Sequence, residues 1–499
     1  MASSIFYTIL RRTYHTRGRD IHLFTRISPL GDPDNNAASV LDQWVGEGRK
    51  VKELELQNII RDLRSRKRYT QALQVSEWMN SKGHSSFSPA DHAVHLDLIG
   101  KIRGVEFAES YFNNLADQDK IDKTYGALLS CYVTEGLVDK SLFHVEKMKA
   151  LGFGVTVLTY NNLLCLYANI GQLEKIPDVF TEMKANGINP DNFSYRICIN
   201  SYGERSDLKN MEMVLEEMES QPYITMDWST YSMVTNFYIK AGLKEKALIC
   251  LKKCEEKVGK DALGYNHLIS LYASLGSKDQ IMRLWDLSKI KRKKQPKMNR
   301  DYITMMGSLV KLGELEEAEK LLTEWEVSCD YYDFRVPNAL LIGYCQKSLI
   351  EKAEAMLRGI VEKGKTPTPN SWSIIAAGYL GKQDMKKAFE CMKEALSIQS
   401  ENKGWRPKPN IISSILSWLG DTGTIEEVEA FVKSLETQLP KGREMYHALI
   451  KANIRFGKEV DGLLEKMKAD EIPEDDDETR AILSSRQQKN PNPITGDDA

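Results

Sequence analysis

The stretch VLTYNNLLCLYANIGQLEKIPDVFTEMKANGINPD, residues 157–191, decides the fold. In each half, apolar residues recur at the three- and four-residue spacing of one helix face. Gly171 between the halves gives the backbone freedom that ends a helix, and Gly187 with Pro190 closes the stretch. The stretch therefore predicts a helix–turn–helix unit. Its apolar positions are Tyr160, Leu163, Leu164, Tyr167 and Ala168 in the first helix, and Leu173, Ile176, Phe180 and Met183 in the second.

Pro177 conflicts with an uninterrupted second helix in this unit. Inside a helix, proline removes a backbone donor and clashes with a preceding carbonyl, at a cost of roughly 3 kcal/mol or more. We expect a local kink at this residue.

The same pattern repeats along the chain. The tyrosines at 125, 160, 195, 231, 265 and 302 are separated by 35, 35, 36, 34 and 37 residues. Glycines at 136, 171, 242, 276, 313 and 423 and methionines at 79, 148, 183 and 218 keep the same frame. Three series in one frame predict tandem repeats, each too short to be stable without its neighbours.

This frame gives an all-α fold, an α-solenoid (right-handed superhelix) of helix–turn–helix repeats of about 35 residues. We expect a transit peptide over residues 1–30, a linker over 31–52, about twelve repeats over 53–474 and an acidic disordered tail over 475–499. The predicted repeats start near residues 53, 88, 122, 157, 192, 228, 262, 299, 334, 369, 409 and 443.

Composition narrows the class of protein. A chain of 499 residues exceeds the size of one hydrophobic core, which agrees with a repeat array. No run of 18 apolar residues occurs, so we expect no membrane-spanning helix. The net charge of −2 gives no general attraction to nucleic acid. The eight cysteines form no C-x-x-C pair and are interpreted as reduced core thiols.

The N-terminus has the composition of an organelle transit peptide. It carries Arg11, Arg12, Arg17 and Arg19, several hydroxyl residues and no acid before Asp20. A disordered basic tail is the alternative interpretation. If the segment is a targeting signal, mitochondrial localisation is favoured and the chloroplast is the alternative.

The repeat unit resembles the pentatricopeptide repeat. The resemblance is carried by VLTYNNLL at 157–164, GQLE at 171–174 and FTEMKANGINPD at 180–191, and it covers about 390 residues in one frame, from 53 to 442. The repeats are uniform in length, as in the pure-repeat (P-type) subgroup of plant mitochondrial type. The resemblance implies an organellar protein that binds single-stranded RNA, one base per repeat.

The resemblance also implies which side chains contact a base. In the family, the fifth and last residues of a repeat read the base edge, and the second residues of adjacent repeats sandwich the base. Transferred to the unit at 157, Asn161 and Asp191 would read a base, with uracil favoured, and Leu158 and Phe193 would sandwich it. Further candidate base-reading residues are Ser232, Asp261 and Asn266.

Other repeats fit this pattern less well, because fifth residues such as Gly126 and Ile303 have no side chain that can hydrogen-bond a base edge. Two ligands therefore stay open. The chain binds organellar RNA and acts in mitochondrial transcript stability, processing or translation, or it is a protein-interaction scaffold associated with the mitochondrial ribosome or with other RNA-processing proteins.

One dense basic cluster offers candidate phosphate contacts, which would make binding salt-dependent. A solvated helix end is an equally good interpretation, and nuclear targeting is a third. The candidate contacts are Lys291, Arg292, Lys293 and Lys294.

No motif predicts catalysis. His144 and Glu146 have the spacing of a zinc-deaminase motif, but the matching P-C-x-x-C is missing. No phosphate-binding loop or nucleophile elbow is present in the sequence. We therefore predict a binding protein, not an enzyme, with no cofactor and no metal.

Overall fold

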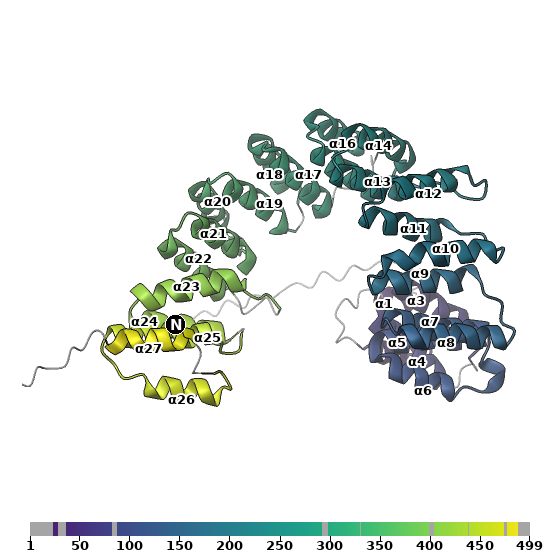
Figure 1. Ribbon diagram of the computed structural model, residues 1–499, viewed down its shortest axis with the longest axis horizontal. Coiled ribbons are helices and arrows are strands. Elements are labelled where there is room, and N and C mark those ends of the chain that lie inside the picture. The colour runs from purple at the N-terminus through teal and green to yellow at the C-terminus, as the bar shows by residue number, and fades with distance from the viewer. Residues whose placement is uncertain are drawn as a thin grey trace, which may run out of the picture. The chain divides into compact units, whose positions relative to one another are not determined.

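The computed structural model describes residues 23–27, 36–81, 87–291, 298–329, 331–398, 404–437, 439–473 and 477–487. Within these ranges every regular element is a helix. The chain divides into two compact units, Met1–Met226 (unit 1) and Asp227–Ala499 (unit 2). In each unit, consecutive helices lie side by side in chain order (Figure 1). The predicted all-α solenoid fold is confirmed.

In both units, two helices alternate. Beyond the first repeat of unit 1, the first helix of each pair packs on the first helix of the next pair in the same unit. The first helices are α3 (Glu53–Ser65), α5 (Pro89–Arg103), α7 (Asp122–Thr134), α9 (Val157–Asn169) and α11 (Asn192–Glu204) in unit 1. In unit 2 they are α13 (Trp228–Lys240), α15 (Ala262–Ser274), α17 (Asn299–Leu312), α19 (Arg335–Gln346), α21 (Pro369–Gly381), α23 (Pro409–Thr422) and α25 (Arg443–Arg455). Every one of these helices begins within one residue of a predicted repeat start.

The second helices cover the other side of each stack. They are α4 (Tyr69–Ser81), α6 (Val105–Asn113), α8 (Val138–Ala150), α10 (Ile176–Ala185) and α12 (Leu208–Ser220) in unit 1. In unit 2 they are α14 (Lys244–Val258), α16 (Lys278–Lys291), α18 (Leu315–Ser328), α20 (Ile350–Glu362), α22 (Met385–Ser397), α24 (Ile425–Glu436) and α26 (Asp461–Ala469). Short 3-10 turns lie at η1 (Asp117–Asp119) and η2 (Leu173–Lys175).

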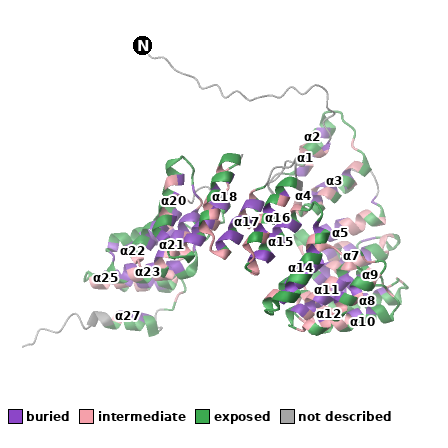
Figure 2. Cartoon of the chain, turned by 90° about the horizontal axis from the view of Figure 1, so that it is seen from above, coloured by how far each residue is buried: buried purple, intermediate pink, exposed green. Residues whose placement is uncertain are grey.

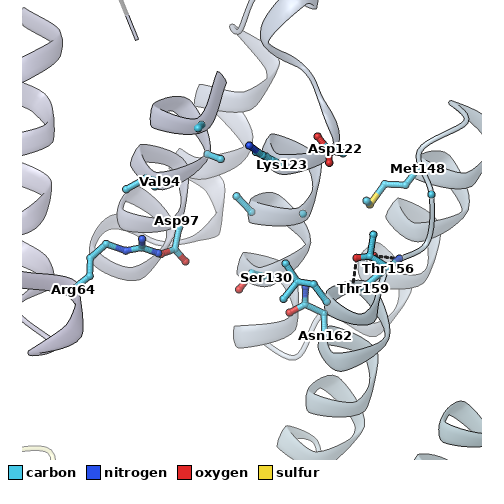
Figure 3. Close-up of a pocket in the computed structure, with 16 residues that line it drawn as sticks. Arg64, Val94, Asp97, Asp122, Lys123, Ser130, Met148, Thr156, Thr159 and Asn162 are labelled. Carbon is cyan, nitrogen blue, oxygen red and sulfur yellow. Dashed lines mark hydrogen bonds and ion pairs between the residues drawn. The ribbon is translucent and has the colours of Figure 1, made fainter. Parts of the chain in front are cut away.

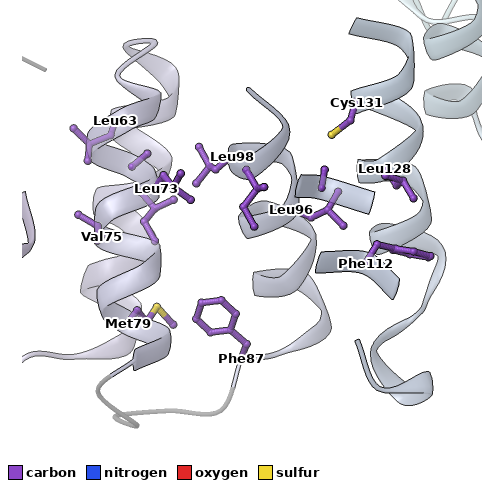
Figure 4. Close-up of a cluster of buried hydrophobic side chains, with 14 of the residues drawn as sticks. Leu63, Leu73, Val75, Met79, Phe87, Leu96, Leu98, Phe112, Leu128 and Cys131 are labelled. Carbon is purple, nitrogen blue, oxygen red and sulfur yellow. The ribbon is translucent and has the colours of Figure 1, made fainter. Parts of the chain in front are cut away.

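Buried residues line the contacts between helices, and exposed residues cover the outward sides (Figure 2). Leu73, Leu96 and Leu128 belong to one such cluster in unit 1 (Figure 4). The periodic tyrosines are core residues, with Tyr160 and Tyr195 each 1% exposed. Full burial of a large apolar side chain contributes about 1.5–3 kcal/mol, so each repeat depends on the next for much of its stability.

The tyrosine hydroxyls link the two helices of a repeat. Tyr160 donates a hydrogen bond to Glu182 at 3.0 Å, and Tyr195 donates one to Glu217 at 2.9 Å. Glu217 also forms an ion pair with Lys184 of the preceding repeat at 3.0 Å. One carboxylate therefore holds its own repeat together and joins it to its neighbour.

Five of the six periodic glycines adopt the positive φ that other residues avoid, which explains their recurrence at the end of a first helix. These five are Gly136, Gly171, Gly242, Gly276 and Gly313. Gly423 differs, because its φ of −76° lies in the extended region.

The kink expected at Pro177 is absent, and this prediction is wrong. The α-helix α10 starts at Ile176, after the turn η2, so Pro177 lies in its first turn. There a missing N–H costs nothing, because the first four helix donors have no partner within the helix.

Helices also occupy the segments predicted as transit peptide, linker and tail. At the N-terminal end, α1 (Leu23–Ile27) and α2 (Ala37–Gly46) pack on each other, and α2 packs on α4. Leu23 and Ile27 are fully buried, and Arg26 pairs with Glu47 at 2.7 Å. The stack thus continues through α2 into the region expected to be a linker, and α1 lies within the segment expected to be a transit peptide.

At the C-terminal end, α27 (Asp477–Gln487) packs on α25. Ile482 of α27 is 7% exposed and joins a cluster with Tyr446 and Ile450. Asp477 follows Arg443 by 34 residues, so α27 takes the place of a further first helix. Part of the region expected to be a disordered tail therefore covers the end of the array.

Among the described residues, no helix has the length and apolarity needed to cross a bilayer. All eight cysteines are free, and five of them are buried. Burial raises the pKa of the Cys198 thiol to about 12.

Candidate nucleic-acid interface

Asn161 and Asp191, the predicted base-reading pair, lie together in unit 1. The Asn161 amide Nδ2 lies 3.2 Å from both carboxylate oxygens of Asp191. The Asn161 Oδ1 atom accepts a hydrogen bond of 2.6 Å from the Ser194 hydroxyl. Asn161 is 6% exposed, and its amide is held in the absence of a ligand by the last residue of its own repeat and by the third residue of the next.

Asp191 has a second task, because it is the N-cap of α11. Its carboxylate accepts the backbone N–H of Ser194 at 2.9 Å, which satisfies a donor that the helix leaves free. Burial raises the pKa of Asp191, but the hydrogen bonds from Ser194 and Asn161 outweigh it and lower the pKa overall. The Asp191 carboxylate is therefore ionised at neutral pH, and the neutral Asn161 amide is oriented against it.

The predicted sandwich residues are exposed although both are large and apolar. Leu158 is 65% exposed and Phe193 is 49% exposed, each at the second place of its first helix. The tyrosines two residues after them are buried, so the exposure is specific to the second place of these helices and is not shared by all their apolar residues. Two exposed apolar side chains on adjacent helices, beside a fixed polar pair, can flank a flat ring.

The other predicted base-reading residues have different partners. Asn266 donates a hydrogen bond of 2.8 Å to Asp301, and both side chains are buried. Asp261 accepts a hydrogen bond of 2.9 Å from the Trp228 indole and caps α15. Within the described part of the chain, Ser232 and Asp261 share no hydrogen bond, so unit 2 does not repeat the Asn161–Asp191 geometry at this pair.

Sequence reasoning missed the third residue of each following repeat. Ser194 and Asp301 occupy that place, and each contacts the fifth residue of the repeat before it. Thr479 of α27 contacts the fifth residue His447 in the same way, at 2.8 Å. A signal was present, because small polar residues recur at the third place of first helices, as in Thr124, Thr159, Ser194 and Thr230.

A groove lies over the first helices α3, α5, α7 and α9 of unit 1 and has a volume of about 410 Å³ (Figure 3). Its floor is apolar, and Leu158 lies at one side. At the other side the Asp97 carboxylate holds two cations, Arg64 of the preceding repeat at 2.8 Å and Lys101. Asp97 is 8% exposed, so its carboxylate is nearly buried and its charge is balanced by these two cations.

The predicted phosphate contacts fall at the edge of what the structure describes. Arg292, Lys293 and Lys294 lie outside the described residues, and of Lys291 only the backbone, at the end of α16, is described. Nearby, Lys289 pairs with Glu324 of the next repeat at 3.1 Å.

His144 and Glu146 form no metal site in the structure. His144 is buried in α8, and its Nε2 lies 3.0 Å from the Tyr125 carbonyl oxygen. In the described ranges, no group of three or more His, Cys, Asp or Glu side chains could hold a metal ion.

Paired helices, a glycine-ended turn and fifth-to-third contacts between repeats define a helical-repeat solenoid. The exposed side of its first helices carries the predicted site residues and is called the candidate ligand face, or ligand face. Family models agree with this class. The model described as PPR repeat family matches residues 155–204. The model described as PPR repeat matches residues 123–153, 193–222, 301–328 and 336–364.

The chain belongs to the pentatricopeptide repeat family. It is 50% identical over 481 residues, 96% of this chain and 97% of the relative, to a mitochondrial pentatricopeptide repeat-containing protein of Arabidopsis thaliana. It is 39% identical to the large ribosomal subunit protein mL101 of the same plant, over 92% of this chain and 94% of the relative. A crystal structure of PPR10 in complex with an 18-nt psaJ RNA element aligns with 94% of this chain and 76% of that chain, with a TM-score of 0.41 and 16% identity.

Proposed function

We propose that this protein binds single-stranded RNA in mitochondria and acts in the stability, processing or translation of an organellar transcript. The observation that carries the proposal is the Asn161–Asp191 pair, held in place by Ser194 and flanked by exposed Leu158 and Phe193. An oriented amide and carboxylate can read a base edge, and the two apolar side chains can cover its faces.

Mitochondrial location is supported by two observations. The N-terminal segment is rich in arginine and hydroxyl residues, and relatives that match along most of the chain carry the word mitochondrial in their names. The uniform repeats agree with the pure-repeat subgroup. As in the sequence analysis, we propose that the protein is not an enzyme.

The test is selection from a randomised single-stranded RNA pool with the full chain and with a variant carrying Asn161→Ala and Asp191→Ala. We expect the wild-type chain to enrich uracil at one position, and the variant to lose that preference or bind more weakly. A matched control carries Asn114→Ala and Asp139→Ala, at two exposed positions away from this pair. Unchanged affinity and base preference in a folded Asn161→Ala, Asp191→Ala variant would falsify the proposal.

A second function, a scaffold in the mitochondrial ribosome, is favoured by the 39% identity to mL101 along nearly the whole chain. Sedimentation of the tagged protein from organelle extract, with and without ribonuclease and with and without magnesium, separates the two functions. A scaffold would sediment with ribosomal subunits, whereas a slowly sedimenting free protein would count against it.

A further inference from the structure

The groove on unit 1 lies directly beside the Asn161 site, because Leu158 belongs to both. Its floor is formed by small residues of two successive first helices: Ala90, Ala93 and Val94 of α5, and Gly126 and Ala127 of α7. The groove volume of about 410 Å³ lies within the range of about 300–1,000 Å³ typical of ligand pockets.

The groove is open because two side chains are missing at the place that Asn161 occupies in its own repeat. Gly126 precedes Asn161 by 35 residues, and Ala93 precedes Gly126 by 33. α5 begins at Pro89, which makes Ala93 its fifth residue. A Cβ atom added at Gly126 would meet nothing within 4 Å, so the space in front of this helix is empty of protein atoms.

Neither of these two residues can recognise a base. Ala93 offers a methyl group and Gly126 only a hydrogen, so neither can donate or accept a hydrogen bond. Among the polar side chains of the lining, Ser130 and Asn162 carry groups that both donate and accept, which suit any base, and Asp122 and Lys123 are exposed at the start of α7. Thr156 and Thr159 bond each other at 3.3 Å, and Arg64 is held by Asp97.

We propose that this groove holds two consecutive nucleobases without selecting among the four, directly beside the position read by Asn161 and Asp191. The inference rests on the proposed function and adds to it a two-base unselective tract in the bound sequence. Flat apolar ring faces suit the alanine and valine floor, and one base per repeat places two bases over the two repeats, those of α5 and α7, that form this floor. Leu158 makes the groove continuous with the selective site.

The test combines RNA selection with ribonuclease protection on the full chain. The wild-type chain should enrich uracil at one position and show two neighbouring positions that are protected but have even base composition. Gly126→Asn places an amide at the position that Asn161 occupies in its own repeat, where the added Cβ atom meets nothing within 4 Å. Asparagine is also more favourable than glycine inside a helix such as α7. This variant should gain a preference of about fivefold or more at the adjacent position, the lower end of what one good base-edge contact provides.

The control is Gly152→Asn, which introduces the same side chain in the turn after α8. Gly152 has a positive φ, a conformation that asparagine also adopts, and a Cβ atom added there meets nothing within 4 Å. This control should leave both positions unchanged. A base preference at the two neighbouring positions in the wild-type chain, or an unaltered pool with Gly126→Asn, overturns the inference while leaving the proposed function intact. Neighbouring bases that stay open to ribonuclease beside a protected uracil also overturn it and favour a protein segment in the groove. Failure to enrich any RNA overturns the proposed function itself.

Discussion

Asp97→Asn is the substitution that most directly tests the electrostatics of the ligand face. In the wild-type chain the Asp97 carboxylate pairs with Arg64 at 2.8 Å and with Lys101, and it is nearly buried between them. Asparagine keeps the shape and can still accept a hydrogen bond from Arg64, but it has no charge. The two cations, whose side chains are about one third exposed, then become available to phosphates.

The size of the effect follows from counterion release. Each phosphate contact on a single strand steepens the dependence of log affinity on log salt by about 0.7, so two released cations give a change of up to about 1.4. Between 50 and 200 mM salt, affinity for RNA should then fall about sevenfold more in the variant than in the wild-type chain. At low salt the variant should bind more tightly.

Fluorescence anisotropy with a labelled single-stranded RNA over this salt range measures the slope. Asp139→Asn, an exposed residue at the start of α8, changes the net charge equally and should leave the slope unaltered. If Asp97→Asn melts like the wild-type chain but binds RNA with the same slope or more weakly, then Asp97 only joins α3 to α5 and the reasoning is refuted.

Three further predictions concern stability. Burial, together with repulsion from His92 and Arg103, lowers the pKa of His95 from 6.5 to about 4. As pH falls, His95 is therefore protonated in the unfolded chain before it is protonated in the folded chain. The stability of α5 should fall by up to ~3 kcal/mol between pH 6.5 and pH 4. Hydrogen exchange of α5 should show this loss in the wild-type chain but not in His95→Gln. Gly100→Ala should destabilise the α5–α7 contact by about 1–3 kcal/mol, because the new methyl group meets the Cys131 sulfur. Adding Cys131→Ala should restore the melting temperature. A double variant that melts as low as Gly100→Ala alone would contradict a steric cause. Ile482→Ala should lower the stability of the C-terminal end by about 2–5 kcal/mol and expose α25 to limited proteolysis. If α25 stays as resistant to proteolysis as in the wild-type chain, α27 does not cover it.

Much of the fold could be predicted from the sequence because each repeat carries the same local signals. The tyrosine, glycine and methionine series locate the two helices and the turn, and the first helices begin within one residue of the predicted places. Pro177 was misjudged because the pattern alone does not show that a 3-10 turn precedes α10 and moves its start. The terminal helices α1, α2 and α27 lack the full series, so only their burial against the array reveals them.

The site could be predicted only where one repeat matches the family pattern closely. Asn161 and Asp191 do lie together. Asn266 instead donates a hydrogen bond to Asp301, and Asp261 accepts one from Trp228. The last residue of the Asn266 repeat is Met298, which offers no strong acceptor, so the Asn266 amide donates to Asp301, the third residue of the next repeat, a position that the family pattern did not include. The groove in front of Gly126 is likewise formed by residues of several helices, α3, α5, α7 and α9 among them, and not by one motif.

The contact from a fifth residue to the third residue of the next repeat has a consequence for anyone who would redirect this protein to a new RNA. Under the proposed function, changing Asn161 alters the base it can face, but it also removes a partner of Ser194 and Asp191, and so loosens the cap of α11. The same side chain would therefore determine both the base that is recognised and the contact with the next repeat. A redesigned repeat will need its fifth and third residues exchanged as a pair, and the conservative place to begin is Gly126, where a new side chain breaks no existing bond.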